Sequence, residues 1–256
     1  MTHLYTADLH VHTLLSPCAA VEMTPRHIIW RAVELGIHIV AVTDHNACDN
    51  VAAAITAAAG TGVTVIPGME VETREEVHLL TLFETMAQLK HWECYVNSKR
   101  SGRKNDETRF GAQFIVDAED NLIAVKEEML LGSINAGVGE VSQTVAELGG
   151  ITIASHIDRP AYSILSQLGF IPPDSQIAAA EVSRLTPLSE VSRLGIGAFP
   201  VITSSDAHTM EDFAAGPRTG FLLERPVLSE IKLALAARDN RRVIGASGGK
   251  ISQPAF

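Results

Sequence analysis

Two histidines stand two residues apart near the start of the chain, in the segment Ala-Asp-Leu-His-Val-His at residues 7–12. The alternation of apolar and polar residues predicts a β-strand, on which Asp8, His10 and His12 project from one face. Two neighbouring imidazoles can bind a divalent metal ion, or they can be polar side chains on a half-exposed edge strand. The metal interpretation requires similar ligands at the ends of other strands.

Side chains of the metal-ligating type do follow several later apolar segments. They are His45, Glu70, His156, Asp206 and His208, with His78 at the start of a further strand. An isolated histidine beside a strand is usually a hydrogen-bonded, half-buried residue. The repetition favours a metal centre, because a barrel of parallel strands gathers its functional groups at the carboxyl-terminal rim.

The segments that must position these residues alternate between strand and helix patterns. Residues 37–43 are almost continuously apolar and rich in β-branched residues, as expected of a strand buried on both faces of a parallel sheet. Thr24 and Pro25 predict the start of the preceding helix, which is expected to end at Gly36. The β-α-β-α-β order and a length of 256 residues predict one α/β barrel.

The alternation breaks between residues 85 and 147, which we interpret as an insertion. A helix is expected over residues 85–96, followed by a basic stretch at residues 97–104 and a β-hairpin formed by residues 110–117 and 121–125. The basic stretch could be a flap that recognises substrate, or a solvated mobile loop. The expected organisation is a first barrel part at residues 1–84, an insertion at residues 85–147 and a second barrel part at residues 148–256.

Five motifs occur in a fixed order along the chain: His-x-His at residues 10–12, Thr-Asp-His at 43–45, Gly-Met-Glu at 68–70, Ser-His at 155–156 and Asp-Ala-His at 206–208. In type and order they resemble the motifs of the polymerase and histidinol phosphatase (PHP) superfamily. The resemblance covers nearly the whole chain outside the insertion. It implies a distorted (β/α)7 barrel, similar to a TIM barrel, that holds two or three metal ions and hydrolyses phosphoesters. The β-hairpin and helix of residues 85–147 would be inserted into this barrel.

The resemblance also implies which residues bind which ion. One ion would be held by His10, His12, Glu70 and Asp206, and a second by Glu70 as a bridge together with His78 and His156. The expected ions are divalent zinc, manganese or iron. Asp8 and Asp44 lie close to the ligating histidines, so we interpret them as groups that orient imidazoles, or as helix or turn caps.

A third ion would be bound by His45 and His208, and its site departs from the superfamily pattern. Relatives complete this site with a histidine or aspartate shortly after the His-x-His motif, where this chain reads Ser16-Pro17-Cys18. Cys18 could substitute as a thiolate ligand, which would favour zinc over manganese. It could equally be a small buried hydrophobic residue.

A centre of this kind predicts hydrolysis without a side-chain nucleophile. Divalent ions a few ångströms apart lower the pKa of a shared water toward neutrality and supply the hydroxide that attacks a phosphoester. His208 or His45 could protonate the leaving oxygen. Arg159 could grip a phosphoryl oxygen through its guanidinium, or it could be a surface residue paired with Asp158.

The charge balance bears on the substrate. Thirty acidic residues against twenty lysines and arginines give a formal net charge of −10, which argues against an extended nucleic-acid surface. We therefore expect a small phosphorylated metabolite or nucleotide as the substrate and no extended nucleic-acid partner. Two alternatives are a PHP module that binds metal without activity, and a hydrolase of another ester, cyclic ester or amide. The latter class usually has a lysine at a strand end, and none stands at these rim positions.

The chain shows no membrane or export signal at the sequence level. No apolar run reaches membrane-spanning length, and no leader pattern opens the sequence. We expect a cytoplasmic protein without a membrane partner, and the sequence leaves its oligomeric state undetermined.

Overall fold

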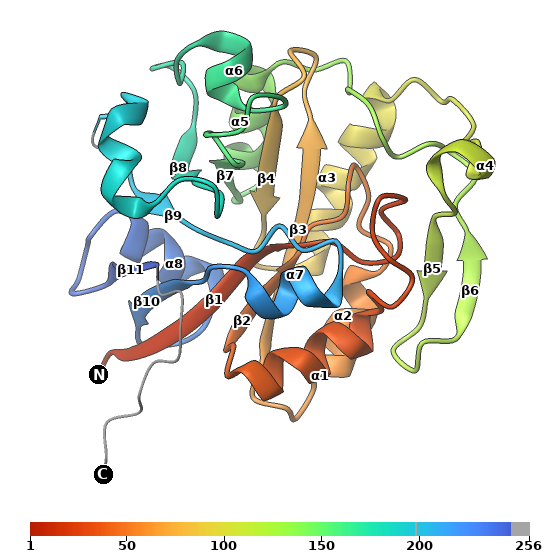
Figure 1. Ribbon diagram of the computed structural model, residues 1–256, viewed down its shortest axis with the longest axis horizontal. Coiled ribbons are helices and arrows are strands. Elements are labelled where there is room, and N and C mark those ends of the chain that lie inside the picture. Colours follow the sequence, from red (N-terminus) through yellow and green to blue (C-terminus); the bar gives the residue numbers. More distant parts are fainter. Residues whose placement is uncertain (198, 247–256) are drawn as a thin grey trace.

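The computed structural model describes residues 1–197 and 199–246, and its dominant feature is one large twisted sheet (Figure 1). Within the described residues this sheet has nine strands, in the order β11-β10-β1-β2-β3-β4-β7-β8-β9. They are β1 (His3–Val11), β2 (Ile39–Val42), β3 (Thr64–Glu72), β4 (His78–Leu82), β7 (Ile151–Ala154), β8 (Ile177–Glu181), β9 (Val201–Ile202), β10 (Thr219–Leu223) and β11 (Arg242–Ala246). The outermost strands β9 and β11 contact each other, so the sheet nearly closes and the expected distorted α/β barrel is confirmed. Residues 198 and 247–256 of the expected second barrel part lie outside the described residues.

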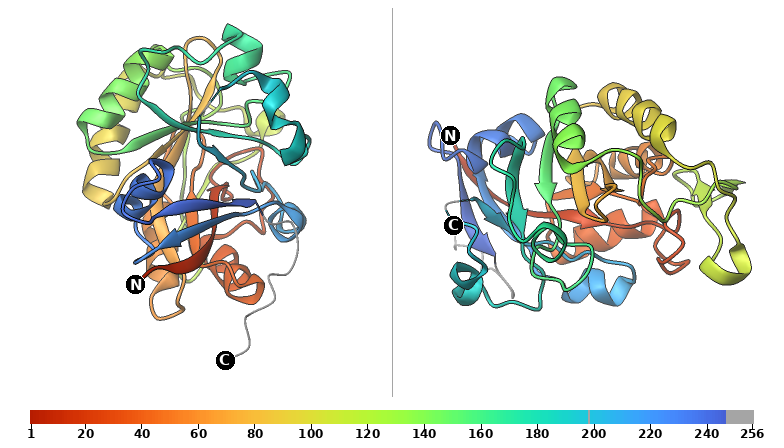
Figure 2. Two further views of the ribbon diagram at one scale, coloured as in Figure 1. Left: turned by 90° about the vertical axis from the view of Figure 1, so that its left-hand side faces the viewer. Right: turned by 90° about the horizontal axis from the view of Figure 1, so that it is seen from above.

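Helices connect most of the strands and pack around the sheet (Figure 2). They are α1 (Pro25–Leu35), α2 (Val51–Ala58), α3 (Met86–Lys99), α4 (Glu107–Phe110), α5 (Val138–Glu147), α6 (Ile164–Leu168), the 3₁₀ helix η1 (Leu188–Leu194), α7 (Met210–Ala215) and α8 (Leu228–Leu235). The Thr24 hydroxyl accepts a hydrogen bond from the His27 N–H at 3.2 Å, and Gly36 ends α1 in the left-handed region at φ 67°, as predicted. In the part of the chain that is described, no helix combines the length and the apolar character needed to cross a membrane.

Strand directions explain how the rim is assembled. β1, β2 and β3 run parallel, and so do β7, β8 and β9, whereas β4 is antiparallel to both β3 and β7. A reversed strand brings its first residue, rather than its last, to the edge where its neighbours end. His78 at the start of β4 therefore pairs in register with Glu72 at the end of β3, on the same rim as the other candidate ligands.

Apolar side chains pack on both faces of the central strands. On β2, Ile39 and Ala41 belong to a cluster that includes α8, while Val40 and Val42 belong to a second cluster that includes α1 and α2. Burial on both faces explains the nearly continuous apolar sequence of this strand. The two clusters fix the strands, and the ends of the strands carry the polar residues of the rim.

The predicted hairpin is present in the insertion. β5 (Phe114–Val116) and β6 (Leu122–Val125) form a separate antiparallel pair that projects from one side of the barrel (Figures 1 and 2). Asn50 attaches this pair to the barrel, because its side chain donates to the Phe114 carbonyl at 3.0 Å and accepts from the Val116 N–H at 3.0 Å.

Candidate metal centre

The strand-end histidines and carboxylates converge at one rim of the barrel, around Glu70. Its carboxylate oxygens lie 3.1–3.5 Å from ring nitrogens of His10, His12, His45, His78 and His156. Asp206 joins this group through His10 and His12, and the His208 ring stacks on His12 with 4.2 Å between ring centroids. The structure therefore brings together eight of the nine expected ligands.

Ligand atoms of His10, His12 and Glu70 form one close group, and Asp206 contacts the two imidazoles of this group. The Nε2 atom of His10 lies 3.2 Å from Glu70 Oε1, 3.2 Å from Asp206 Oδ1 and 3.2 Å from His12 Nε2. His12 Nε2 lies 3.4 Å from Glu70 Oε2 and 3.4 Å from Asp206 Oδ1. Ligand atoms at about 2.0–2.1 Å from a tetrahedral zinc ion are about 3.3 Å from one another. The observed separations thus fit a small divalent cation between His10, His12 and Glu70, with Asp206 beside the two imidazoles.

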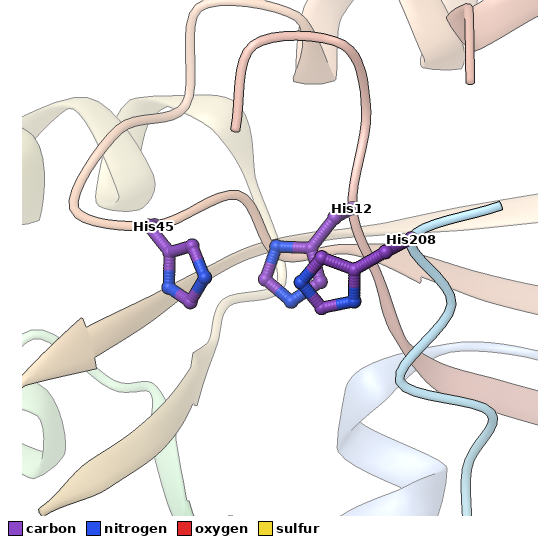
Figure 3. A group of neighbouring side chains, drawn as sticks. All are labelled: His12, His45 and His208. Atoms are coloured by element: carbon purple, nitrogen blue, oxygen red, sulfur yellow. The ribbon is translucent and has the colours of Figure 1, made fainter. Parts of the chain in front are cut away.

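Two further groups share residues with the first. His45 Nδ1 lies 3.1 Å from Glu70 Oε2, and His78 Nδ1 lies 3.2 Å from Glu70 Oε1. His12, His45 and His208 make the third group, and their rings lie side by side in Figure 3. Because the two oxygens of Glu70 contact different imidazoles, this carboxylate has the geometry needed to bridge two ions.

Two buried polar atoms of this site have no hydrogen-bond partner among the described residues. They are His156 Nδ1 and Glu70 Oε1, which lies 3.2 Å from His10 Nε2 and from His78 Nδ1 without the alignment of a hydrogen bond. A buried polar atom left without a partner costs free energy, and a cation bound by Glu70 would remove that cost for the carboxylate oxygen. Imidazole nitrogens and carboxylate oxygens are ligands that suit zinc, manganese and iron. The residues present therefore fit a centre of several divalent ions.

Hydrogen bonds to Nδ1 hold two of the imidazoles with Nε2 toward the centre. His10 Nδ1 lies 3.1 Å from each carboxylate oxygen of Glu181, and His12 Nδ1 lies 3.0 Å from Ser16 Oγ. The Ser16 hydroxyl donates to Asp44 at 2.7 Å, so it accepts the proton on His12 Nδ1. With Nδ1 protonated in this way, Nε2 is the atom of each ring that offers a lone pair to a metal ion when the imidazole is neutral.

Glu181 is the functional residue that the sequence analysis missed. It is fully buried and is the last residue of β8, so it lies at the same rim of the barrel as the residues that were identified. Asp44 acts on His12 through Ser16, as expected in outline. Asp8 differs from the expectation, because it accepts from the Ser205 N–H at 3.0 Å and lies 3.2 Å from Arg218 Nε. It therefore fixes the segment next to Asp206 instead of orienting an imidazole.

Charge interactions among the side chains of the centre outweigh the effect of burial on their pKa values. Burial disfavours the charged forms of Glu70 and His10. The positive charges of His78 and His10 nevertheless hold the pKa of Glu70 well below 4.5, and Asp206, Glu181 and Glu70 raise the pKa of His10 well above 6.5. The carboxylates of the centre thus attract positive charge, which protons supply in the apoprotein and which metal ions can supply in their place.

His208 differs from these residues in its protonation. Burial and the neighbouring His12 lower the pKa of His208 to about 3, so its ring is neutral near pH 7. Its Nδ1–H donates to the Asp206 carbonyl at 3.0 Å. The Nε2 atom is left with a lone pair, which suits a ligand better than a proton donor.

The backbone is strained where three of the rim segments leave their strands. Asn46, His156 and Asp206 have φ angles of 48°, 27° and 49°, in the left-handed region that residues with a Cβ rarely adopt. Such conformations cost about 1–3 kcal/mol each and persist where surrounding contacts hold them. At Asn46 the side chain provides these contacts by donating to the Leu130 and Gly132 carbonyls at 2.8 and 2.9 Å.

Cys18 and Arg159 lie at the edge of the centre. Cys18 is exposed, so the alternative of a buried hydrophobic residue is wrong, and its thiol contacts His45. It does not join the three groups of ligand atoms found in residues 1–197 and 199–246. The Arg159 guanidinium lies 2.5 Å from Asp206 Oδ2, and Asp158 instead accepts from the Ser183 N–H at 2.8 Å. The alternative in which Arg159 pairs with Asp158 is therefore wrong as well.

A pocket of about 600 Å³ opens beside the centre. One wall comes from the barrel and includes Cys18, His45, His78 and Tyr162. The other wall comes from the insertion and includes Arg100, Arg103, Phe110, Met129, Leu131 and Ser133. Any substrate that reaches the metal ligands through this pocket contacts the insertion on its way.

The sequence is similar to that of the 5'-3' exoribonuclease Rnm of Escherichia coli (strain K12). The two are 24% identical over 169 residues, a match that spans 65% of this chain and 56% of Rnm. This chain therefore covers little more than half the length of that relative.

Solved structures with a similar fold include the lesion-specific endonuclease Q of Pyrococcus furiosus and an amidohydrolase of Chromobacterium violaceum. The endonuclease has a TM-score of 0.70 and 18% identity, over 96% of this chain and 59% of its own. The amidohydrolase has a TM-score of 0.56 and 18% identity, over 82% of this chain and 90% of its own. At 18% identity, these two structures support the assignment of the fold alone.

The comparisons correct our expectation of a small phosphorylated substrate without an extended nucleic-acid partner. Rnm is named as an exoribonuclease, and a solved complex of endonuclease Q holds a 27-mer duplex substrate with an abasic lesion at the active site. The expectation failed because a net charge of −10 is a sum over the whole molecule. It does not describe the local charge at one pocket, which depends on the arginines that line the pocket and on any cations bound beside it.

The family assignment rests on a longer match. Residues 8–168 match the model of the PHP domain. The match begins two residues before His10 and extends past His156, so it contains four of the five rim motifs. Because it spans more than half of the 256 residues, the chain belongs to the PHP domain family.

Proposed function

We propose that this protein is a metal-dependent hydrolase of phosphodiester bonds in nucleic acid. The observation that carries the proposal is the convergence of imidazole nitrogens and carboxylate oxygens on Glu70, at separations that suit two or more divalent ions. The activities for which Rnm and endonuclease Q are named support nucleic acid as the substrate. RNA is the first substrate to test, because the similarity to Rnm extends to the sequence.

Divalent ions bound at this rim would lower the pKa of a bound water and neutralise the charge of phosphoryl oxygens. The role of the protein is to hold the metal-binding side chains in place before substrate arrives. His10 and His12 are fully buried, and Glu181 and Ser16 fix the directions of their rings. Ligands positioned in this way need no rearrangement during the reaction.

We assign Arg159 to the binding of a phosphoryl oxygen. Its contact with Asp206 keeps the guanidinium at the edge of the centre, while 38% of the side chain remains exposed. Guanidinium can form two parallel hydrogen bonds to a phosphate, which lysine cannot reproduce. Exchange of Arg159 for lysine therefore removes the paired hydrogen bonds and retains the charge.

We assign His45 and His208 to the third ion as ligands, with Cys18 at the edge of that site. The neutral His208 ring, with its Nδ1–H held by the Asp206 carbonyl, supports this role over proton donation. His45 Nδ1 lies 3.1 Å from Glu70, which supports a ligand role for this residue too.

The test is the dependence of RNA hydrolysis on metal. Protein stripped with a chelator would be assayed on an end-labelled single-stranded RNA, alone and after addition of manganese or zinc. We expect cleavage only with added metal, and none with Glu70→Gln, which retains the shape of the side chain and removes its charge. Parallel assays on DNA of the same sequence and on p-nitrophenyl phosphate define the substrate class. Hydrolysis of p-nitrophenyl phosphate with neither nucleic acid cleaved would contradict the proposal.

A further inference from the structure

Two aromatic side chains line the pocket beside the metal centre, one on each of its walls. Tyr162 comes from the loop between β7 and α6, and Phe110 ends α4 of the insertion. The Tyr162 ring stacks on His78 with 4.8 Å between ring centroids and an angle of 26°, and 45% of the residue stays exposed. The backbone at Tyr162 is left-handed, with φ 58°. Strain of this kind is found where a fold holds a side chain in a functional position.

Arg103 places a free cation in the same pocket. It is exposed and forms no ion pair with any residue that the structure describes. Arg100 also lines the pocket, but its side chain is 4% exposed and is committed to Glu128 at 3.4 Å and to the Met129 carbonyl at 2.6 Å. Of the two arginines that line the pocket, Arg103 is thus the one available to an anionic ligand.

The wall formed by the insertion is fixed to the barrel. Asn46, next to His45, donates to the Leu130 and Gly132 carbonyls, and the Ser133 hydroxyl donates to Glu72 at 2.6 Å. The Met129 N–H donates to the Arg103 carbonyl at 2.9 Å, which ties the arginine to the same wall. The pocket is therefore formed before a ligand enters, and this limits the entropy lost on binding.

We propose that this pocket binds one unpaired nucleotide, with its base against Phe110 and Tyr162 and a neighbouring phosphate at Arg103. The inference rests on the proposed function and specifies its substrate as an end or an unpaired segment of a strand. The metal ligands support this choice, because His10 and Glu70 are 1% exposed or less. A scissile phosphate must enter the pocket to reach them, and a base inside an intact duplex is not free to follow.

The chemistry of the lining selects a nucleotide over other anionic ligands. Aromatic faces stack on the faces of bases with little preference for sequence, and a nearby arginine neutralises the phosphate backbone. A volume of about 600 Å³ lies within the range of pockets for single small ligands. Tyr162 already stacks on His78, and the Arg109 guanidinium lies 5.0 Å from the centroid of the Phe110 ring. A base can extend these stacks, whereas a phosphorylated sugar has no planar group to do so.

The kinetic test compares Phe110→Ala and Tyr162→Ala with Phe170→Ala, an aromatic residue that is 58% exposed and outside the pocket. The substrates are a short single-stranded RNA and the same RNA with abasic residues at both ends. We expect each pocket variant to raise KM for the intact RNA about five-fold or more, the size of one lost base stack, with kcat unchanged for Phe110→Ala. Tyr162→Phe should restore the wild-type KM, and KM for the abasic RNA should not change. Equal KM values for both pocket variants and Phe170→Ala would overturn the base site.

A binding experiment separates this inference from the proposed function. Titration of the metal-free protein with adenosine monophosphate, followed by ligand-observed NMR, needs no turnover. Weaker binding in both pocket variants than in Phe170→Ala supports the base site, whether or not the wild-type protein cleaves nucleic acid. A lack of cleavage by the wild-type protein would overturn the proposed function and leave the base site standing. Equal binding by all proteins overturns the base site.

The phosphate contact has a test of its own. Arg103→Gln should lower the slope of log KM for RNA against log salt concentration by about one. An unchanged slope contradicts a phosphate contact at Arg103.

Discussion

The rim of the barrel and the insertion face each other across one pocket and are held in opposite ways. On the rim, His10 and Glu70 are buried, and Glu181 fixes the His10 ring. In the insertion, Arg103 is exposed and Phe110 is half-buried, and these residues are positioned through the backbone of their segment. We propose from this comparison that the barrel supplies a rigid array of metal ligands and that the insertion contributes to substrate recognition. Damage to either region should therefore affect a different measurable quantity.

The largest effect is expected from removal of a ligand on the rim. His10→Ala and Asp206→Ala should each bring hydrolysis below detection, because His10 belongs to a group of ligand atoms around Glu70 and Asp206 contacts His10 and His12 in that group. Each variant should remain folded, since neither residue belongs to the apolar clusters. Activity assays and circular dichroism check this expectation. Persistent activity in both variants would refute the proposed centre.

A smaller effect is expected from Glu181→Gln, which keeps the volume of the side chain and weakens its hold on the His10 ring. Loss of such a partner lowers metal affinity by about 10- to 100-fold. Glu230→Gln is the matched control, because Glu230 is also a buried acid and its partner is Arg241, away from the rim. Competition with a metal-sensitive dye measures the affinities. Equal affinities for the two variants would show that Glu181 does not position a ligand.

Damage to the insertion should spare the metal. Gln113 is buried, donates to the Lys126 and Glu128 carbonyls at 2.7 and 2.8 Å, and accepts from the Leu130 N–H at 2.8 Å. Gln113→Ala should destabilise the insertion locally by about 1–3 kcal/mol, because buried backbone groups lose their partner. Hydrogen exchange of residues 113–130 should accelerate while the metal content stays at the wild-type level. A parallel loss of metal would show that the two regions are not independent.

The smallest effect is expected from Cys18→Ser. The thiol contacts His45, but the residue is exposed and lies outside the three ligand groups. We expect zinc to bind less tightly at the third site, by less than about ten-fold, while the other sites keep their affinity. Zinc titration followed by calorimetry resolves the sites. A uniform loss at all sites would place Cys18 inside the centre.

The sequence was sufficient to predict those features that repeat a local pattern. His45 and His156 were found because each directly follows an apolar strand, and the hairpin was found from two short apolar segments with an acidic turn between them. The position of His78 was found as well, although its physical reason, the reversal of β4, becomes visible only in the sheet.

Features that depend on partners distant in the chain could not be predicted. Glu181 matters because β8 places it against His10, which is 171 residues away in sequence. Arg159 pairs with Asp206 instead of its neighbour Asp158 because of the path of a loop. The substrate class was misjudged because total charge cannot locate Arg103 beside the buried residues of the candidate metal centre.

Glu70 is shared between the proposed metal sites, and the metal content of the protein tests this sharing most directly. Elemental analysis of purified wild-type protein should give about two to three divalent ions per chain, from three overlapping groups of ligand atoms. Glu70→Gln should retain at most one ion per chain, because two of the three groups of ligand atoms contain the Glu70 carboxylate. Wild-type protein without metal, or a variant with the full content, would contradict the account.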